Sequence, residues 1–216
     1  VLTATFVRGA FERAGHSVRL ETPPTAVAAP MEQHRRPFVA SFPGHRGTKF
    51  SYPTLLTWFD EWLDATDGQR GHDATLLLTD TGYPNGGLAG KAVAVARTGR
   101  AVCGLPCDYE PFGYTVAHDG VHTVLHELGH TLMGSVDQTD HDGLGHHDVG
   151  AVYDRPGGKT ISPMGAEGPT NECGEPVDDT DVVGVELTWS DCCLRHWDPP
   201  QGAAGDRHVR GEGAVT

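Results

Sequence analysis

The residues best suited to chemistry are His126, Glu127 and His130, which form the pattern His-Glu-x-x-His. Residues four positions apart lie on one face of a helix, so the two imidazoles can hold a single metal ion. Glu127 lies beside the first histidine and can reach a water molecule in the open coordination position of that ion. Zinc would lower the pKa of this water, and Glu127 would accept its proton as the water attacks a peptide carbonyl. The spacing therefore predicts a Zn²⁺ site with Glu127 as general base.

This pattern needs a helix to carry it and further elements to support that helix. We expect the helix to begin near Asp119, a favourable N-cap, and to end at Met133, before Gly134. Other helices are expected at about 4–14, with Gly15 as C-cap, and at 53–65 and 190–197. Strands are expected at 17–21, 74–79, 91–96 and 100–104. Residues 1–200 should form one domain, and the Gly- and Ala-rich residues 201–216 a disordered tail.

Composition and charge argue against several classes of partner. The formal net charge of −13 disfavours nucleic acid and anionic membranes, because their phosphates would be repelled. No run of about 18 apolar residues is present to span a bilayer, and the polar start Val1–Leu20 does not resemble a signal peptide. Lysine occurs only at Lys49, Lys91 and Lys159. This acidic, lysine-poor pattern resembles halophilic proteins more than an ordinary acidic protein from a GC-rich genome.

A wider set of motifs resembles a known family. HELGHTLMG (126–134), followed by Ser162-Pro163-Met164-Gly165, resembles the metzincin zinc peptidases, with Met164 in the Met-turn beneath the metal. Three further segments are similar, in their order, to the reprolysin or ADAM-type branch of that clan. They are LLTWFDEWLDATDGQRGHDATLLLTD (55–80), GLAGKAVAVARTGRAVCG (87–104) and Trp189-Ser190-Asp191-Cys192. The likeness spans roughly residues 50–197, and only HELGH is specific by itself.

This resemblance implies an α/β fold with a twisted, mixed and mostly parallel sheet, a long zinc-binding helix and an irregular C-terminal subdomain. It implies that a polypeptide substrate pairs antiparallel with an edge strand near 91–96. It also implies a disulfide between Cys103 and Cys192, which would tie the sheet to the last helix. We further expect a secreted, monomeric enzyme, with a second pair possible among the other cysteines: Cys107, Cys173 and Cys193.

The chain departs from the family pattern at the third zinc ligand. The pattern has a glycine three residues after the second histidine and a ligand six residues after it, but Met133 and Val136 occupy these positions. One inserted residue restores the register and makes Asp137 the ligand, as in the snapalysin-like metzincins. A longer insertion makes His141 the ligand, followed by aspartate as in ADAM-type sites. Both alternatives stay open, because imidazole and carboxylate both bind zinc. Outside candidates are His146 and His147.

Other polar residues have simpler interpretations. His122 lies one turn before His126 on the same helix face, where we expect a partly buried histidine at the cleft rim rather than a donor that supports the metal site. Met164 is expected in the Met-turn rather than as an ordinary core methionine. The acidic run Asp178, Asp179 and Asp181 is expected to be solvated surface rather than a calcium site.

The leading prediction is thus a zinc metalloendopeptidase, a hydrolase, and two alternatives remain. A thermolysin-like gluzincin would need Glu167 or Glu172 as third ligand, yet both lie in Gly- and Pro-rich sequence that does not predict a helix. A non-catalytic binding module could retain the metal scaffold. The intact Glu127 argues against it, because loss of this carboxylate is the simplest route to an inactive relative.

Overall fold

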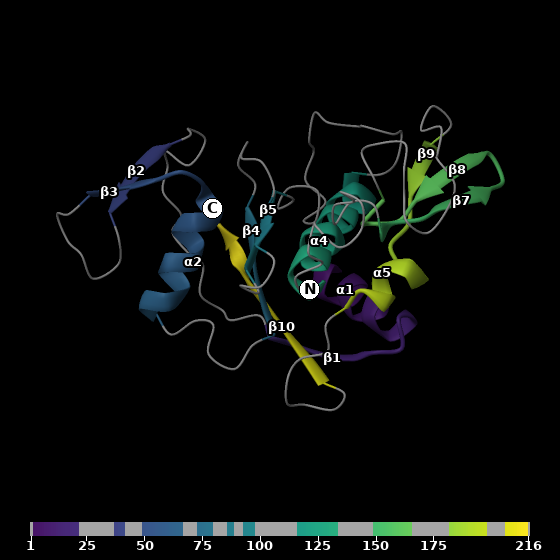
Figure 1. Ribbon diagram of the computed structural model, residues 1–216, viewed down its shortest axis with the longest axis horizontal. Coiled ribbons are helices and arrows are strands. Elements are labelled where there is room, and N and C mark those ends of the chain that lie inside the picture. Colours follow the sequence, from purple (N-terminus) through teal and green to yellow (C-terminus); the bar gives the residue numbers. More distant parts are fainter. Residues whose placement is uncertain are drawn as a thin grey trace.

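A five-stranded sheet forms the centre of the protein (Figure 1). The structure, a computed structural model, describes residues 2–21, 37–41, 49–66, 73–79, 86–88, 93–97, 116–133, 149–165, 182–197 and 206–215. Within these ranges α2 (Leu55–Thr66) covers one face of the sheet, and α1 (Leu2–Arg13) and α4 (Val116–Leu132) cover the other. A smaller three-stranded sheet lies beyond α4. The chain is therefore a mixed α/β protein.

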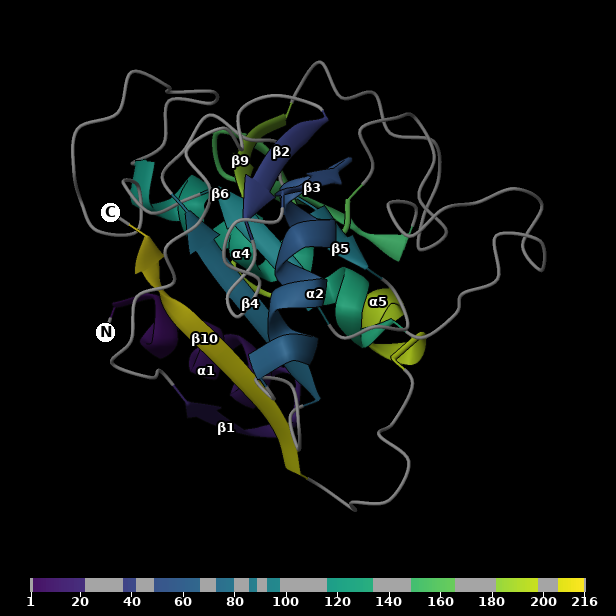
Figure 2. The ribbon, with the colours of Figure 1, turned by 90° about the vertical axis from the view of Figure 1, so that its left-hand side faces the viewer.

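The central sheet has the strand order β1-β10-β4-β6-β5. Its first four strands run parallel: β1 (Ser17–Glu21), β10 (Asp206–Val215), β4 (Ala74–Thr79) and β6 (Val93–Arg97). Only β5 (Gly86–Leu88) is antiparallel, and it pairs with β6 (Figure 2). Along β4, Leu76 packs toward α4 and Leu77 toward α2, as the two-residue period of a strand requires. Both faces of β4 are buried, which explains its continuous apolar sequence.

Two predictions about the sheet are wrong. The segment near 91–96 is not an edge, because β6 pairs with β4 on one side and with β5 on the other. Residues 206–215 form β10 between β1 and β4, so the expected disorder of 201–216 does not hold for them. Composition was a poor guide here, because the sheet hydrogen bonds of a strand come from its backbone and are open to Gly- and Ala-rich sequence.

Local sequence explains where the helices begin and end. Gly15 has φ of +78°, and the N–H groups of Gly15 and His16 donate to the carbonyls of Glu12 and Phe11 at 3.0 and 2.9 Å, which ends α1. The hydroxyl of Thr54 accepts from the N–H of Thr57 at 3.1 Å and caps α2. Helix α4 begins at Val116, so Asp119 lies inside it and is not the predicted N-cap.

Two smaller sheets lie outside the central one. In the first, β2 (Phe38–Ser41) pairs antiparallel with β3 (Lys49–Tyr52). The second sheet contains β7 (Val152–Arg155), β8 (Gly158–Ile161) and β9 (Val182–Val185), in a region expected to be irregular. These strands have only four residues each, which is too short for a clear periodic signal. The predicted strand at 100–104 lies outside the described residues, as does the acidic run at 178–181.

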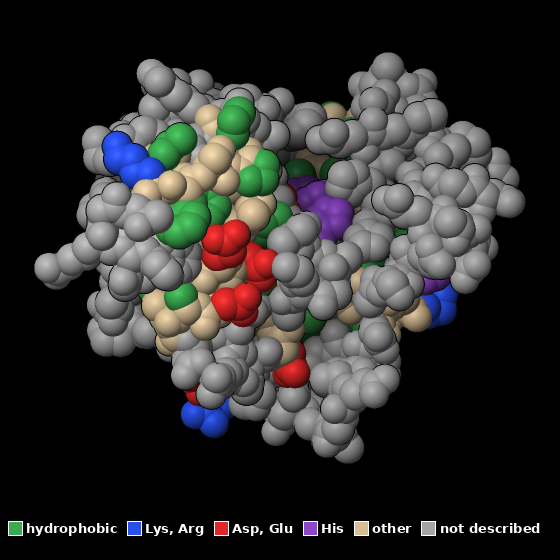
Figure 3. Space-filling model, turned by 60° about the vertical axis from the view of Figure 1, so that its left-hand side comes forward, with side chains coloured by type: hydrophobic (Ala, Val, Ile, Leu, Met, Phe, Trp, Pro, Cys, Tyr) green, Lys and Arg blue, Asp and Glu red, His purple; other side chains and the backbone are tan. Residues whose placement is uncertain are grey.

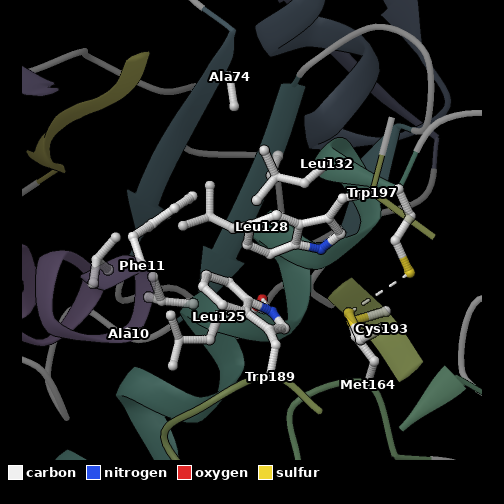
Figure 4. Close-up of a cluster of buried hydrophobic side chains, with 14 of the residues drawn as sticks. Ala10, Phe11, Ala74, Leu125, Leu128, Leu132, Met164, Trp189, Cys193 and Trp197 are labelled. Carbon is white, nitrogen blue, oxygen red and sulfur yellow. Dashed lines mark hydrogen bonds between the residues drawn. The ribbon is translucent and has the colours of Figure 1, made fainter. Parts of the chain in front are cut away.

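A cluster of aromatic side chains packs in the same core as the apolar side chains of α4. Phe11 of α1 is fully buried, with its ring centroid 5.0 Å from that of Trp189 and 5.6 Å from that of Trp197. Leu125, Leu128 and Leu132 of α4 lie in the same core (Figure 4). The short helix α5 (Asp191–Arg195) is capped by Ser190, whose hydroxyl accepts from the N–H of Cys193 at 3.0 Å. No helix among the described residues is long and apolar enough to cross a bilayer.

Replacing Phe11 with alanine should destabilise the protein by about 3–5 kcal/mol, because the substitution leaves a cavity between α1 and the two tryptophans. Urea unfolding followed by tryptophan fluorescence measures this change in the free energy of unfolding. The matched control is Arg8→Ala on the exposed side of the same helix, which should change it by less than about 0.5 kcal/mol. Equal losses in the two variants would contradict the packing described here.

Candidate metal centre

The imidazoles of His126 and His130 converge on one point. Their Nε2 atoms are 3.2 Å apart, and the two rings are nearly perpendicular, with centroids 4.8 Å apart and an interplanar angle of 85°. In a tetrahedral zinc site, two imidazole nitrogens bound at about 2.0–2.1 Å would lie roughly 3.3 Å from each other. Both side chains are half-buried, and histidine side chains are visible in a recess of the molecular surface (Figure 3). The pair therefore has the geometry of two zinc ligands.

A backbone carbonyl fixes the orientation of His126. Its Nδ1–H donates to the carbonyl oxygen of Pro163. Because a carbonyl only accepts, the proton of the neutral ring must be on Nδ1, and Nε2 keeps its lone pair. Histidines that bind metals commonly donate their other ring N–H in this way, which fixes both the tautomer and the ring orientation. His126 is thus prepared to bind a metal through Nε2.

The segment Ser162–Gly165 forms a tight turn under α4. The N–H of Gly165 donates to the carbonyl of Ser162 at 2.8 Å, which closes a β-turn with Pro163 and Met164 in its central positions. Met164 is fully buried, and its sulfur lies against Gly129, the helix residue between the two histidines. A Cβ on Gly129 would be 2.4 Å from this sulfur, so only glycine permits the contact as it stands. Met164 therefore lies where the Met-turn was expected.

Several hydrogen bonds hold this turn and α4 together. The hydroxyl of Ser162 accepts from the N–H of Ala151 at 2.9 Å, and the N–H of Ser162 donates to the carbonyl of Ala151 at the same distance. The indole of Trp189 donates to the carbonyl of Leu125 in α4 at 3.1 Å. The hydroxyl of Ser190 donates to the carbonyl of Val149 at 2.8 Å. Together these bonds join α4, the turn and the start of α5.

Glu127 is buried beside the two histidines. Only 4% of its surface is exposed, and its Oε2 has no hydrogen-bond partner within the described part of the chain. Burial raises the pKa of this carboxyl to about 8 in the metal-free protein. A buried carboxylate oxygen without a partner is costly, and it fits a site that is completed by a cation and a water molecule. The donors present here therefore fit zinc.

The third ligand belongs to a part of the chain outside the described residues in each of the predicted alternatives. Both main candidates, Asp137 and His141, and the outside candidates His146 and His147 lie outside the described residues. The same is true of Glu167 and Glu172, which the thermolysin-like alternative requires. Within the described ranges no group of three or more potential ligands forms a metal site. The structure thus describes two candidate ligands, His126 and His130, with Glu127 next to His126 in α4.

The described cysteines lie next to each other in α5 and differ in state. Cys192 is disulfide-bonded, and its partner is outside the described residues, so the predicted pair with Cys103 stays a prediction. Cys193 is a buried free thiol whose pKa is raised to about 12, chiefly by burial. Its sulfur lies 3.9 Å from that of Met133, at the end of α4. Cys192 and Cys193 both lie in the core that contains the apolar side chains of α4.

Three contributors to the site carried little signal in the sequence. The acceptor for His126 is the backbone oxygen of Pro163, which no side-chain pattern reveals. The role of Gly129 depends on a close approach by Met164, which only coordinates show. Trp189 was noted as part of a motif, but its hydrogen bond to the backbone of Leu125 was not foreseen. Comparison of the chain with family models, with curated proteins and with solved structures finds no match.

Replacing Gly129 with alanine should destabilise the protein by about 1–3 kcal/mol, because the new Cβ would overlap the sulfur of Met164. Thermal or urea unfolding of the metal-free protein measures the loss. In the presence of Met164→Ala the same substitution should cost much less, since the overlapping atom is gone.

The matched control is Gly9→Ala in α1, where a Cβ would meet only the end of the Arg13 side chain, at 3.2 Å. This control should stabilise the protein by about 0.5–1 kcal/mol, because alanine favours helix over glycine. Additive effects of the Gly129 and Met164 substitutions would contradict the contact.

Proposed function

We propose that this chain is a zinc-dependent endopeptidase with a metzincin-type site. The observation that carries the proposal is the convergence of the His126 and His130 Nε2 atoms at 3.2 Å, with His126 Nδ1 occupied by the Pro163 carbonyl. Two incidental surface histidines would have no reason to share one focus or to have one ring anchored from behind. The buried, unpartnered Oε2 of Glu127 adds the group that hydrolysis needs at this place.

The residues around the proposed metal centre have separate roles in peptide hydrolysis. Bound zinc would acidify a water molecule in its open position and polarise the carbonyl of the scissile bond. Oε2 of Glu127 accepts the proton of the attacking water and can later deliver it to the nitrogen of the leaving amine. The burial of Glu127 excludes bulk water from this proton transfer. The Pro163 carbonyl keeps His126 directed at the metal during these steps.

The proposed substrate is a polypeptide in extended conformation. Among the described strands β5 is the antiparallel edge of the central sheet, and it packs beside α4. An extended peptide could add to this edge through main-chain hydrogen bonds and pass the metal centre on α4. This assigns to β5 (Gly86–Leu88) the role that was first expected of residues 91–96. The enzyme class is therefore an endopeptidase that recognises backbone as well as side chains.

We also infer that the protein works outside the cell, as a monomer. The disulfide at Cys192 supports this location, because such bonds persist in oxidising compartments. The formal net charge of −13 supports a salt-rich medium, in which a hydrated acidic surface keeps a protein soluble. The same charge disfavours nucleic acid and anionic membranes as partners.

Replacing Glu127 with glutamine should lower the rate of casein cleavage by about 10²–10⁴-fold, because the amide cannot accept the proton. Zinc content should stay at one ion per chain, since His126 and His130 remain. Metal analysis and cleavage assays at low and high salt measure both quantities. The control is Glu12→Gln on the exposed side of α1, which should keep full activity. Stoichiometric zinc without cleavage by the wild-type protein at any salt concentration would instead favour a non-catalytic binding module.

Single substitutions at the two main candidates identify the third ligand. We expect either Asp137→Ala or His141→Ala to weaken zinc binding strongly, and the other to leave it near the wild-type value. Competition with a chromophoric chelator measures the dissociation constant of each variant. His146→Ala and His147→Ala serve as comparisons with two other histidines of the same segment. Unchanged zinc affinity in both main variants would remove Asp137 and His141 from the site.

A further inference from the structure

His122 is a half-buried histidine that the proposed chemistry does not use. It lies in α4 one turn before His126, and its Nε2 is buried without a hydrogen-bond partner among the described residues. The backbone of Ser162 and Ile161 lies close enough to the ring to raise the pKa of His122, against the larger lowering by burial. His122 thus lies beside the segment that leads into the turn.

Successive residues of the segment that follows β8 meet successive turns of α4. Ile161 and Ser162 lie near His122, the Pro163 carbonyl accepts from His126, and Met164 packs against Gly129. The segment Ile161–Met164 therefore runs along α4 in the direction of the helix. The position of this segment along the helix sets the position of the Pro163 carbonyl. The hydrogen bond to that carbonyl in turn sets the orientation of the His126 ring.

His122 is the polar side chain of α4 that lies beside the first residues of this segment, Ile161 and Ser162. The buried Nε2 without a described partner is unfavourable compared with an apolar side chain of similar size, so filling space alone does not explain a histidine at this position. Burial lowers the pKa of His122 to about 4, with a further lowering from His126. Its position in α4, one turn before His126 and beside the backbone of Ile161 and Ser162, suits a residue that aligns this backbone without being a ligand.

We propose that His122 is a positioning residue of the metal centre, which holds the Ile161–Ser162 backbone so that the Pro163 carbonyl meets His126 Nδ1. This inference rests on the proposed zinc site and deepens it. It assigns His122 to the support of a ligand and not to the ligand set. The side chain acts through the backbone of the turn, and zinc affinity is the property that it controls.

The test compares His122→Phe and His122→Leu, which fill the space without an N–H, with His122→Gln, which keeps a donor. We expect the two apolar variants to bind zinc about 10–100-fold more weakly, in the range found for partners of metal-ligating histidines. The melting temperature of the metal-free protein should not fall in parallel, because the unpaired nitrogen is removed. The visible spectrum of the Co²⁺-loaded protein should change in the apolar variants and return toward wild type in His122→Gln.

The control is His196→Gln, at the end of α5, which should leave zinc affinity and the Co²⁺ spectrum unchanged. Either apolar variant suffices if the other does not fold. Zinc affinity within threefold of wild type in a folded apolar variant would overturn the positioning role. So would a loss as complete as that of His130→Ala, since His122 would then be a ligand. If the wild-type protein binds no zinc, the proposed function fails first, which separates the two failures.

Discussion

The hydrogen bond between His126 and the Pro163 carbonyl joins parts of the chain that are 37 residues apart. It requires the residues that follow β8 to lie against α4 at one fixed position along the helix. That register brings Met164 beneath Gly129 and leaves no room there for a side chain on the helix. The orientation of the first ligand is thus a result of tertiary packing. A helix carrying the same five residues in isolation would present both histidines with free rotation.

The site buries polar groups, and the free-energy cost of doing so must be offset by other parts of the fold. Glu127 and His122 each have a buried atom without a partner in the described part of the chain, and both are unfavourable for folding. The aromatic cluster of Phe11, Trp189 and Trp197 belongs to the same core as the apolar side chains of α4 and supplies apolar burial. Trp189 belongs to both parts, since its indole also bonds to the backbone of α4. Stability gained in the core therefore offsets the polar cost at the centre.

Sequence reasoning succeeded where a short-range rule governs the result. The i, i+4 spacing of His126 and His130 was enough to foresee that their rings would meet, and the apolar run 74–79 was enough to foresee a buried strand. It failed where long-range pairing decides. The β10 strand depends on the open sides of β1 and β4, and the edge position of β5 depends on how β6 is paired. Neither relation can be read from the composition of one segment.

Residues 134–148 are flanked by two contacts that reach the same short stretch of the chain. Met133 pairs with Trp197 through a β-bridge, and the carbonyl of Val149 accepts a hydrogen bond from Ser190. The C-terminal end of α4 and the residues that lead into β7 are therefore both attached to the stretch around α5. A change that displaces α5 would thus act on both ends of the segment that contains Asp137 and His141.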